Sequence, residues 1–128
     1  MEKTAIHSND APAAVGPYSQ AVSVGNTVYL AGQLGIEPSS GTLREGFAAQ
    51  THQVFQNLRA VCCAAGGDLS DIVRLGVFLT DMERFAEFNQ IMSEYFTTPY
   101  PARAAVQVVA LPRGGLVEAE AVMVKSGA

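Results

Sequence analysis

Apolar and polar residues alternate in five stretches of the chain, which is the pattern of β-strands that bury at least one face. The first two stretches lie on either side of Gly25-Asn26, a dipeptide typical of a tight turn, and so predict a β-hairpin. The third is rich in β-branched side chains, and the last two are separated by the turn sequence LPRGG. The predicted strands are residues 21–24, 27–35, 71–80, 102–109 and 116–124.

Two other segments change to the period of an amphipathic helix. From Phe47 the apolar residues recur at alternating spacings of four and three over about five turns. This helix is expected to end at Gly66-Gly67, where a glycine can take the left-handed conformation of a C-cap. Asp81 can cap a second helix, whose apolar face runs from Phe85 to Phe96 before the sequence TTPYP stops it.

The order of these elements is β-β-α-β-α-β-β, which predicts an α+β two-layer sandwich. A mixed sheet of about six strands is covered on one face by the two helices, and residues 1–128 are expected to form a single domain. The strands carry apolar side chains on both faces, so the second face also needs a cover. We expect another copy of the chain to provide it, which makes the protein a homo-oligomer.

Composition excludes several classes of function. The chain has 128 residues, 48% of them hydrophobic, and a net charge of −4 with few, scattered basic residues, which disfavours nucleic acid as a partner. The N-terminal sequence MEKTAIHSND lacks the apolar core of a signal peptide, and no apolar run approaches the roughly 18 residues of a membrane span. We therefore expect a cytoplasmic protein with no membrane contact. The two histidines and two cysteines are too dispersed for a metal site.

Arg103 is the only charge in PARAAVQVVALP, a stretch that otherwise suits the interior of a sheet. On a strand it shares its face with Ala105, Gln107 and Val109, and these small neighbours leave room for a guanidinium. A buried cation needs an anion. Two interpretations stay open: a salt bridge to Glu118 or Glu120, within or between chains, and a clamp for the carboxylate of a ligand, which arginine grips well.

Glu118 and Glu120 are two residues apart and so lie on one face of an otherwise apolar strand. Carboxylates in such a place are costly unless they are paired or serve in proton transfer. In a simple hairpin across LPRGG, Arg103 would lie roughly 13 Å along the strand from Glu118. Either the two strands are not neighbours, or the two residues meet across a boundary between subunits.

Three further positions are candidates for a ligand pocket, although none is specific alone. Tyr18 follows Gly16-Pro17, which fixes the backbone and can aim the phenol or anchor the loop to the core. Asn89 lies among the apolar residues of the second helix. Gly32 ends a strand and lets a ligand approach the backbone N–H groups.

Taken together, several segments resemble one family, the reactive intermediate (Rid) deaminases, also known as YjgF-type enamine/imine deaminases. The resemblance runs almost from end to end. It implies a chorismate-mutase-like α+β fold, a homotrimer and active-site clefts between subunits. It also implies hydrolysis of 2-aminoacrylate and related enamines or imines, released by pyridoxal-phosphate enzymes, to a 2-keto acid and ammonia, with no cofactor of its own. The segments are APAAVGPYSQA at 11–21, AGQ at 31–33, QTHQVFQNLRAV at 50–61, FAEFNQIMSEYF at 85–96, PAR at 101–103 and LPRGGLVEAEAV at 111–122.

The resemblance also implies roles for individual residues. It makes Arg103 the residue that binds the substrate carboxylate and Glu118, rather than Glu120, the acid that orients or activates water. Tyr18 and Asn89 fall on positions that line the family's pocket, and Gly32 on backbone that contacts the ligand.

Two positions depart from the family's common pattern. Ala31 stands where a serine is frequent, and Ala105 where a cysteine is frequent, so these two positions are expected to change the range of substrates. The alternative function is a non-catalytic, trimeric protein that binds small carboxylates or acts like a chaperone. Ribonuclease activity is also associated with the family, but the acidic balance of the chain argues against it.

Overall fold

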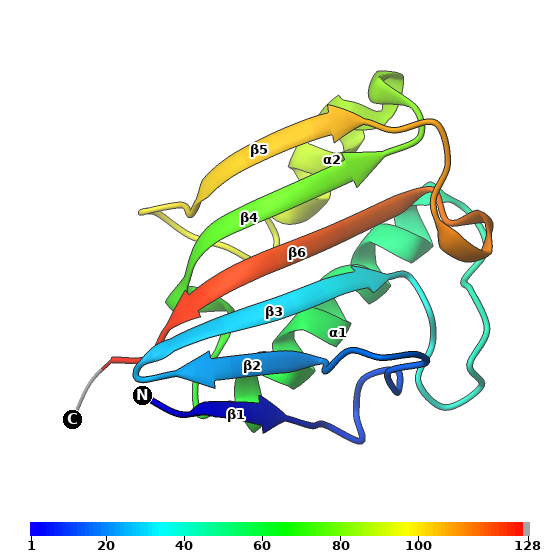
Figure 1. The fold of residues 1–128 in the computed structure, drawn as a ribbon. Coiled ribbons are helices and arrows are strands. Elements are labelled where there is room, and N and C mark those ends of the chain that lie inside the picture. The colour runs from blue at the N-terminus through cyan, green and yellow to red at the C-terminus, as the bar shows by residue number, and fades with distance from the viewer. Residues whose placement is uncertain (127–128) are drawn as a thin grey trace.

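The structure is a computed structural model, and it describes residues 1–126. It contains one six-stranded mixed sheet in the order β1-β2-β3-β6-β4-β5, with both α-helices on one face (Figure 1). Neighbouring strands are antiparallel except β4 and β5, which are parallel. The expected α+β two-layer sandwich is confirmed. The strands are β1 Lys3–Ile6, β2 Ala21–Val24, β3 Thr27–Leu34, β4 Ile72–Leu79, β5 Ala102–Gln107 and β6 Val117–Val124.

The long helix has the expected position and end. Helix α1 spans Phe47–Ala64, and Gly66 follows it with φ of 93°. The N–H of Gly66 donates to the carbonyl of Cys63, and the N–H of Gly67 donates to that of Cys62, so the last turn is closed by backbone hydrogen bonds.

The second helix is shorter than its apolar pattern predicts. Asp81 does accept a hydrogen bond from the N–H of Glu83, but it caps the 3-10 turn Met82–Arg84 that precedes helix α2, Phe85–Met92. The apolar face continues past the end of the α-helix, because buried Phe96 belongs to the core that α2 also covers. Two further 3-10 turns span Leu69–Asp71 and Pro112–Gly114.

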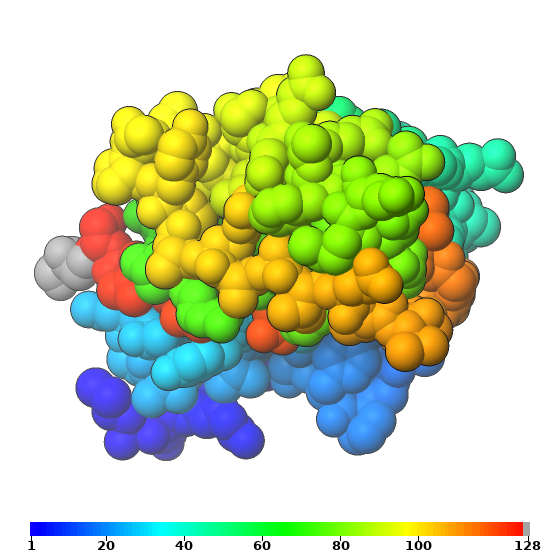
Figure 2. Space-filling view, turned by 90° about the horizontal axis from the view of Figure 1, so that it is seen from above, coloured from blue at the N-terminus to red at the C-terminus, as the bar shows by residue number. Residues whose placement is uncertain are grey.

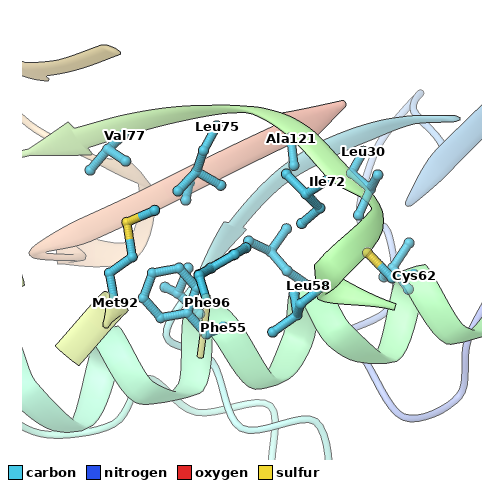
Figure 3. Packing of buried hydrophobic residues seen from close by; sticks show 14 of the residues in the cluster. Leu30, Phe55, Leu58, Cys62, Ile72, Leu75, Val77, Met92, Phe96 and Ala121 are labelled. Atoms are coloured by element: carbon cyan, nitrogen blue, oxygen red, sulfur yellow. The ribbon is translucent and has the colours of Figure 1, made fainter. Parts of the chain in front are cut away.

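The core lies between the helices and one face of the sheet. Leu75, Val77, Leu58 and Phe55 are all essentially inaccessible to solvent there (Figure 3). The side chain of Phe55 packs against the rings of three aromatic residues from α2 and the segment after it, which are Phe88, Tyr95 and Phe96. Burial of these large side chains fixes the helices on the sheet.

The other face of the sheet has no helix and carries apolar side chains, as expected. Tyr29, Val106 and Val124 are 54%, 47% and 41% exposed there, although each belongs to a strand. Strand β1 was not predicted, because three of its four residues are exposed and leave no alternating pattern. Among residues 1–126, no helix is both long and apolar enough to cross a membrane.

Candidate active site

Arg103 lies on β5, which is one of the two outer strands of the sheet, and it is exposed rather than buried as its sequence context suggested. It pairs with Leu75 of β4, whose side chain is in the core, so Arg103 is on the face that the helices cover. No carboxylate of residues 1–126 lies within 4.0 Å of the guanidinium. The expectation of a salt bridge to Glu118 or Glu120 within one chain is therefore wrong.

Helix α2 holds the guanidinium with uncharged groups. Nη1 of Arg103 donates a hydrogen bond of 2.6 Å to Oδ1 of Asn89 and lies 3.6 Å from Sδ of Met92. The ring of Phe85 lies beside the guanidinium, with 5.0 Å between its centroid and the central carbon. Asn89 was expected only to line a ligand pocket. In the structure it also holds the side chain of Arg103 in place.

A cavity of about 430 Å³ opens beside this arginine. It lies next to the segment that leads from α2 into β5, and Figure 2, which looks onto the β5 edge, shows that segment at the surface in yellow. The volume suits a small organic acid. The lining residues are Asn89, Met92, Ser93, Tyr100, Pro101 and Arg103.

Glu118 lies on the opposite face of the sheet from Arg103. It pairs with Phe78 on β4, while its neighbours Val117 and Ala119 point into the core. The strand β4 lies between β5 and β6, so the two candidate residues are not on adjacent strands. The sequence indicated that a simple hairpin would keep Arg103 and Glu118 too far apart for one small ligand. The structure shows that their strands are not neighbours, because β4 lies between them.

The carboxyl of Glu118 lies directly against Gly32. A Cβ built on Gly32 would be 3.0 Å from Cδ and 3.2 Å from Oε1 of Glu118, so only glycine leaves this carboxyl its position. Burial of the half-buried side chain raises the pKa of Glu118 above its ordinary value, and the nearby charge of Glu120 adds to the rise. A carboxyl with a raised pKa holds a proton more readily than an ordinary one, which suits a group that takes up and returns a proton.

A β-bulge brings this part of β3 to the site. The register of β3 and β6 shifts between Leu30 and Gln33, so that Ala31 and Gly32 together face Glu120. Bulges often occur beside active sites, where they redirect a strand. Gly32 and Glu118 therefore form one group on the uncovered face, while Arg103 and Asn89 form another on the helix side.

The remaining candidates are less tightly placed. Ala105 shares the face of Arg103 and packs against the core. Tyr18 is 53% exposed, and its hydroxyl accepts a long hydrogen bond of 3.4 Å from the N–H of Val15. Two residues later, the carbonyl of Gln20 accepts from the N–H of Ala31, which places this loop alongside the bulge.

The sequence pattern does not distinguish the residues that support Arg103, because it places Phe85 and Met92 only on the apolar face of a helix. Tyr100, which lines the cavity, lies in the sequence that stops this helix. The signal that was available is the spacing of Phe85, Asn89 and Met92 by four and then three residues, which puts them on one stripe of α2. In residues 1–126 no three His, Cys, Asp or Glu side chains gather as a metal site would need.

Comparison with known families identifies the family of the chain. The sequence profile of the family described as Endoribonuclease L-PSP matches residues 8–125, nearly the whole chain. The chain belongs to this family. It is also called the YjgF/RutC/Rid family, so the resemblance found in the sequence is confirmed.

Rid-family relatives match the chain in sequence and in structure. The mouse protein named 2-iminobutanoate/2-iminopropanoate deaminase is 48% identical over 121 residues, which cover 94% of this chain and 90% of the mouse protein. The crystal structure of RidA from Psychrobacter is 56% identical, with a TM-score of 0.94 over 95% of this chain and 99% of that one. The E. coli TdcF structure with bound serine is 35% identical, with a TM-score of 0.91 over 96% of this chain and 99% of that one.

Proposed function

We propose that this protein hydrolyses reactive imines of 2-keto acids, such as 2-iminopropanoate and 2-iminobutanoate, to the keto acid and ammonia. The observation that carries the proposal is Arg103. Its guanidinium is held by neutral groups at the rim of a 430 Å³ cavity and lacks a carboxylate partner among residues 1–126. A cation arranged in this way can bind the carboxylate of a small acid. The mammalian relatives that carry the deaminase name support this substrate class.

We place the complete site between copies of the chain. Arg103 lies on the helix side of the outer strand and Glu118 on the uncovered side of β6, so one small molecule cannot reach both within a single chain. The apolar side chains on the uncovered face favour its burial against a second copy. A homotrimer with one such site at each interface is the assembly we propose. Tyr18, Ala31 and Ala105 would then line this site, and the last two would tune its specificity.

Hydrolysis of the imine needs a positioned water molecule and a group that transfers protons. Arg103 binds the carboxylate of the imino acid and orients its imine carbon. Glu118 takes a proton from water as the water oxygen bonds to that carbon, and it passes this proton to the imine nitrogen, which gives a neutral carbinolamine. Glu118 then takes the hydroxyl proton as the keto group forms and delivers it to the nitrogen, which leaves as ammonia when the C–N bond breaks. Atoms balance as imine plus water to keto acid plus ammonia.

An enamine such as 2-aminoacrylate enters the same path after it tautomerises to the imine. Pyridoxal-phosphate enzymes release species of this class, so we propose a functional link to them. No step of this scheme calls for a metal or an organic cofactor in the protein. The scheme needs no contact with nucleic acid, for which the net charge of −4 is unsuited.

The alternative is a non-catalytic protein that binds small carboxylates in the same place or acts like a chaperone. The serine bound to the E. coli relative favours it, because an amino acid in that structure shows binding rather than turnover. The two functions share Arg103 and differ in their need for Glu118.

The test is a coupled assay in which 2-iminopropanoate is generated in solution and keto acid release is followed. The purified protein should accelerate release above the spontaneous rate. Arg103→Ala should abolish the acceleration, because the carboxylate loses its charged partner. Glu118→Gln should retain binding of pyruvate while turnover falls about a hundredfold or more. A rate equal to the spontaneous one, with pyruvate binding intact, would favour the binding protein.

A further inference from the structure

The ring of Phe85 does more than fill space at the start of α2. Its centroid lies 5.0 Å from the central carbon of the Arg103 guanidinium, within the range of a cation–π contact. The side chain is only partly buried, so its role is not limited to the core against which it packs.

The other two contacts engage the same nitrogen of the arginine. Asn89 Oδ1 and Met92 Sδ both lie against Nη1, at 2.6 Å and 3.6 Å. Within residues 1–126, Nε and Nη2 of Arg103 make no hydrogen bond, and they form the side-on edge of the guanidinium. Two adjacent N–H donors on one edge match the two oxygens of a carboxylate.

None of the three supporting groups carries a negative charge. A carboxylate in the place of Asn89 or Phe85 would also hold the arginine, but it would cancel the charge that attracts an anionic ligand. The quadrupole of an aromatic ring stabilises a cation and leaves its net charge in place. The three uncharged groups therefore fix the guanidinium, and its positive charge stays available to an anionic ligand.

We propose that Phe85 is a positioning residue for substrate binding: through its contact with Arg103 it sets the plane of the guanidinium so that Nε and Nη2 face the substrate carboxylate. The inference rests on the proposed carboxylate-binding function of this site. It adds that affinity for the carboxylate depends on an aromatic ring which touches no part of the substrate.

The experiment compares Phe85→Leu, which removes the ring, with Phe85→Tyr, which keeps it. Phe85→Met is a second ring-free variant with an unbranched side chain. If one of the two variants fails to fold, the other still tests the loss of the ring. Phe88→Leu is the matched control on the same helix, because Phe88 is fully buried against Phe55 and is absent from the contacts of Arg103. Binding of 2-oxobutanoate is measured by calorimetry, and KM and kcat are measured in the imine assay.

We expect Phe85→Leu and Phe85→Met to weaken 2-oxobutanoate binding and raise KM about tenfold, with a smaller change in kcat. Phe85→Tyr should restore both to about the wild-type value. Phe88→Leu should lower the melting temperature and leave 2-oxobutanoate binding unchanged. If Phe85 had a purely structural role, Phe85→Leu would give this same result.

The outcomes separate this inference from the proposed function. Unchanged binding in both ring-free variants, with wild-type turnover, overturns the role of Phe85 and leaves the deaminase intact. Weakened binding in the ring-free variants, with no turnover in any variant or in the wild-type protein, supports the role of Phe85 and overturns the deaminase. A wild-type protein that binds no 2-oxobutanoate overturns both.

Discussion

Mixing two inactive variants should restore activity if the active site is built between chains. Arg103→Ala removes the proposed carboxylate-binding half of the site, and Glu118→Gln removes the proposed water-activating half, which lies on the opposite face of the sheet. Each joined site needs Arg103 from one copy and Glu118 from its neighbour. With equal and random mixing, each of these is intact in half of the chains, so about a quarter of the sites should be complete.

The assay uses the two variants co-expressed with different affinity tags and purified through both tags in turn, so that only mixed assemblies are measured. Double purification removes the inactive pure assemblies, and each mixed trimer then holds one complete site, so keto acid release should reach about a third of the wild-type rate per site. A matched control combines Arg103→Ala with Asn89→Asp, which places a carboxylate at the Arg103 nitrogen. Both of these changes affect the same half-site, so their mixture should stay inactive.

Activity no higher than that of the parent variants would refute the reasoning, because it would mean that Arg103 and Glu118 serve one site within one chain. Equal recovery in the control mixture would also refute it, since changes on the same half-site cannot complement each other. The size of the recovery is informative as well. Each mixed assembly holds one complete site, which is a third of the sites in a trimer and half of those in a dimer, so the recovered rate also reports the number of copies.

Two further predictions concern Glu118. Gly32→Ala places a methyl carbon 3.0 Å from its Cδ, so the carboxyl must move by a few tenths of an ångström, and kcat should fall about tenfold with little change in the melting temperature or in 2-oxobutanoate binding. Unaltered kcat would show that the carboxyl position is not critical. Because burial raises the pKa of Glu118 in the folded protein, its contribution to stability is lost as pH rises through that pKa. Glu118→Gln should therefore raise the melting temperature at pH 7, and the gain should disappear near pH 4; an equal gain at both pH values would contradict this linkage.

Much of the fold could be predicted from the sequence, because its signals are local. The Gly25-Asn26 turn, the spacing after Phe47 and the left-handed Gly66 each determine an element through a few adjacent residues. The order of strands could not be obtained in this way. Periodicity places a side chain on a face, but it does not say which strand lies next to which, and so the insertion of β4 between β5 and β6 was not predicted.

The candidate site shows the same division. A lone charge on an apolar strand indicates Arg103, and two carboxylates on one face indicate Glu118, and the roles of both stay predictions. The pattern predicts that Arg103 is buried, whereas the structure exposes it. A run of small and β-branched residues occurs on outer strands as well as inner ones, and the exposure of the strand depends on its neighbours in the sheet. The role of Asn89 and Phe85 in holding the arginine was not accessible, since a helical stripe has the same spacing whether it faces the core or a site.

The position of β5 at the margin of the sheet has a consequence for solubility. An outer strand presents unpaired backbone groups to which another strand can add, and proteins often place a charge there to discourage such growth. In β5, ARAAVQ, the only charge is Arg103, so Arg103→Ala leaves six uncharged residues with a free edge. We expect Arg103 to protect the isolated chain against aggregation in addition to its proposed role in binding a carboxylate. Arg103→Lys, which keeps the charge without the planar fork, separates these two roles.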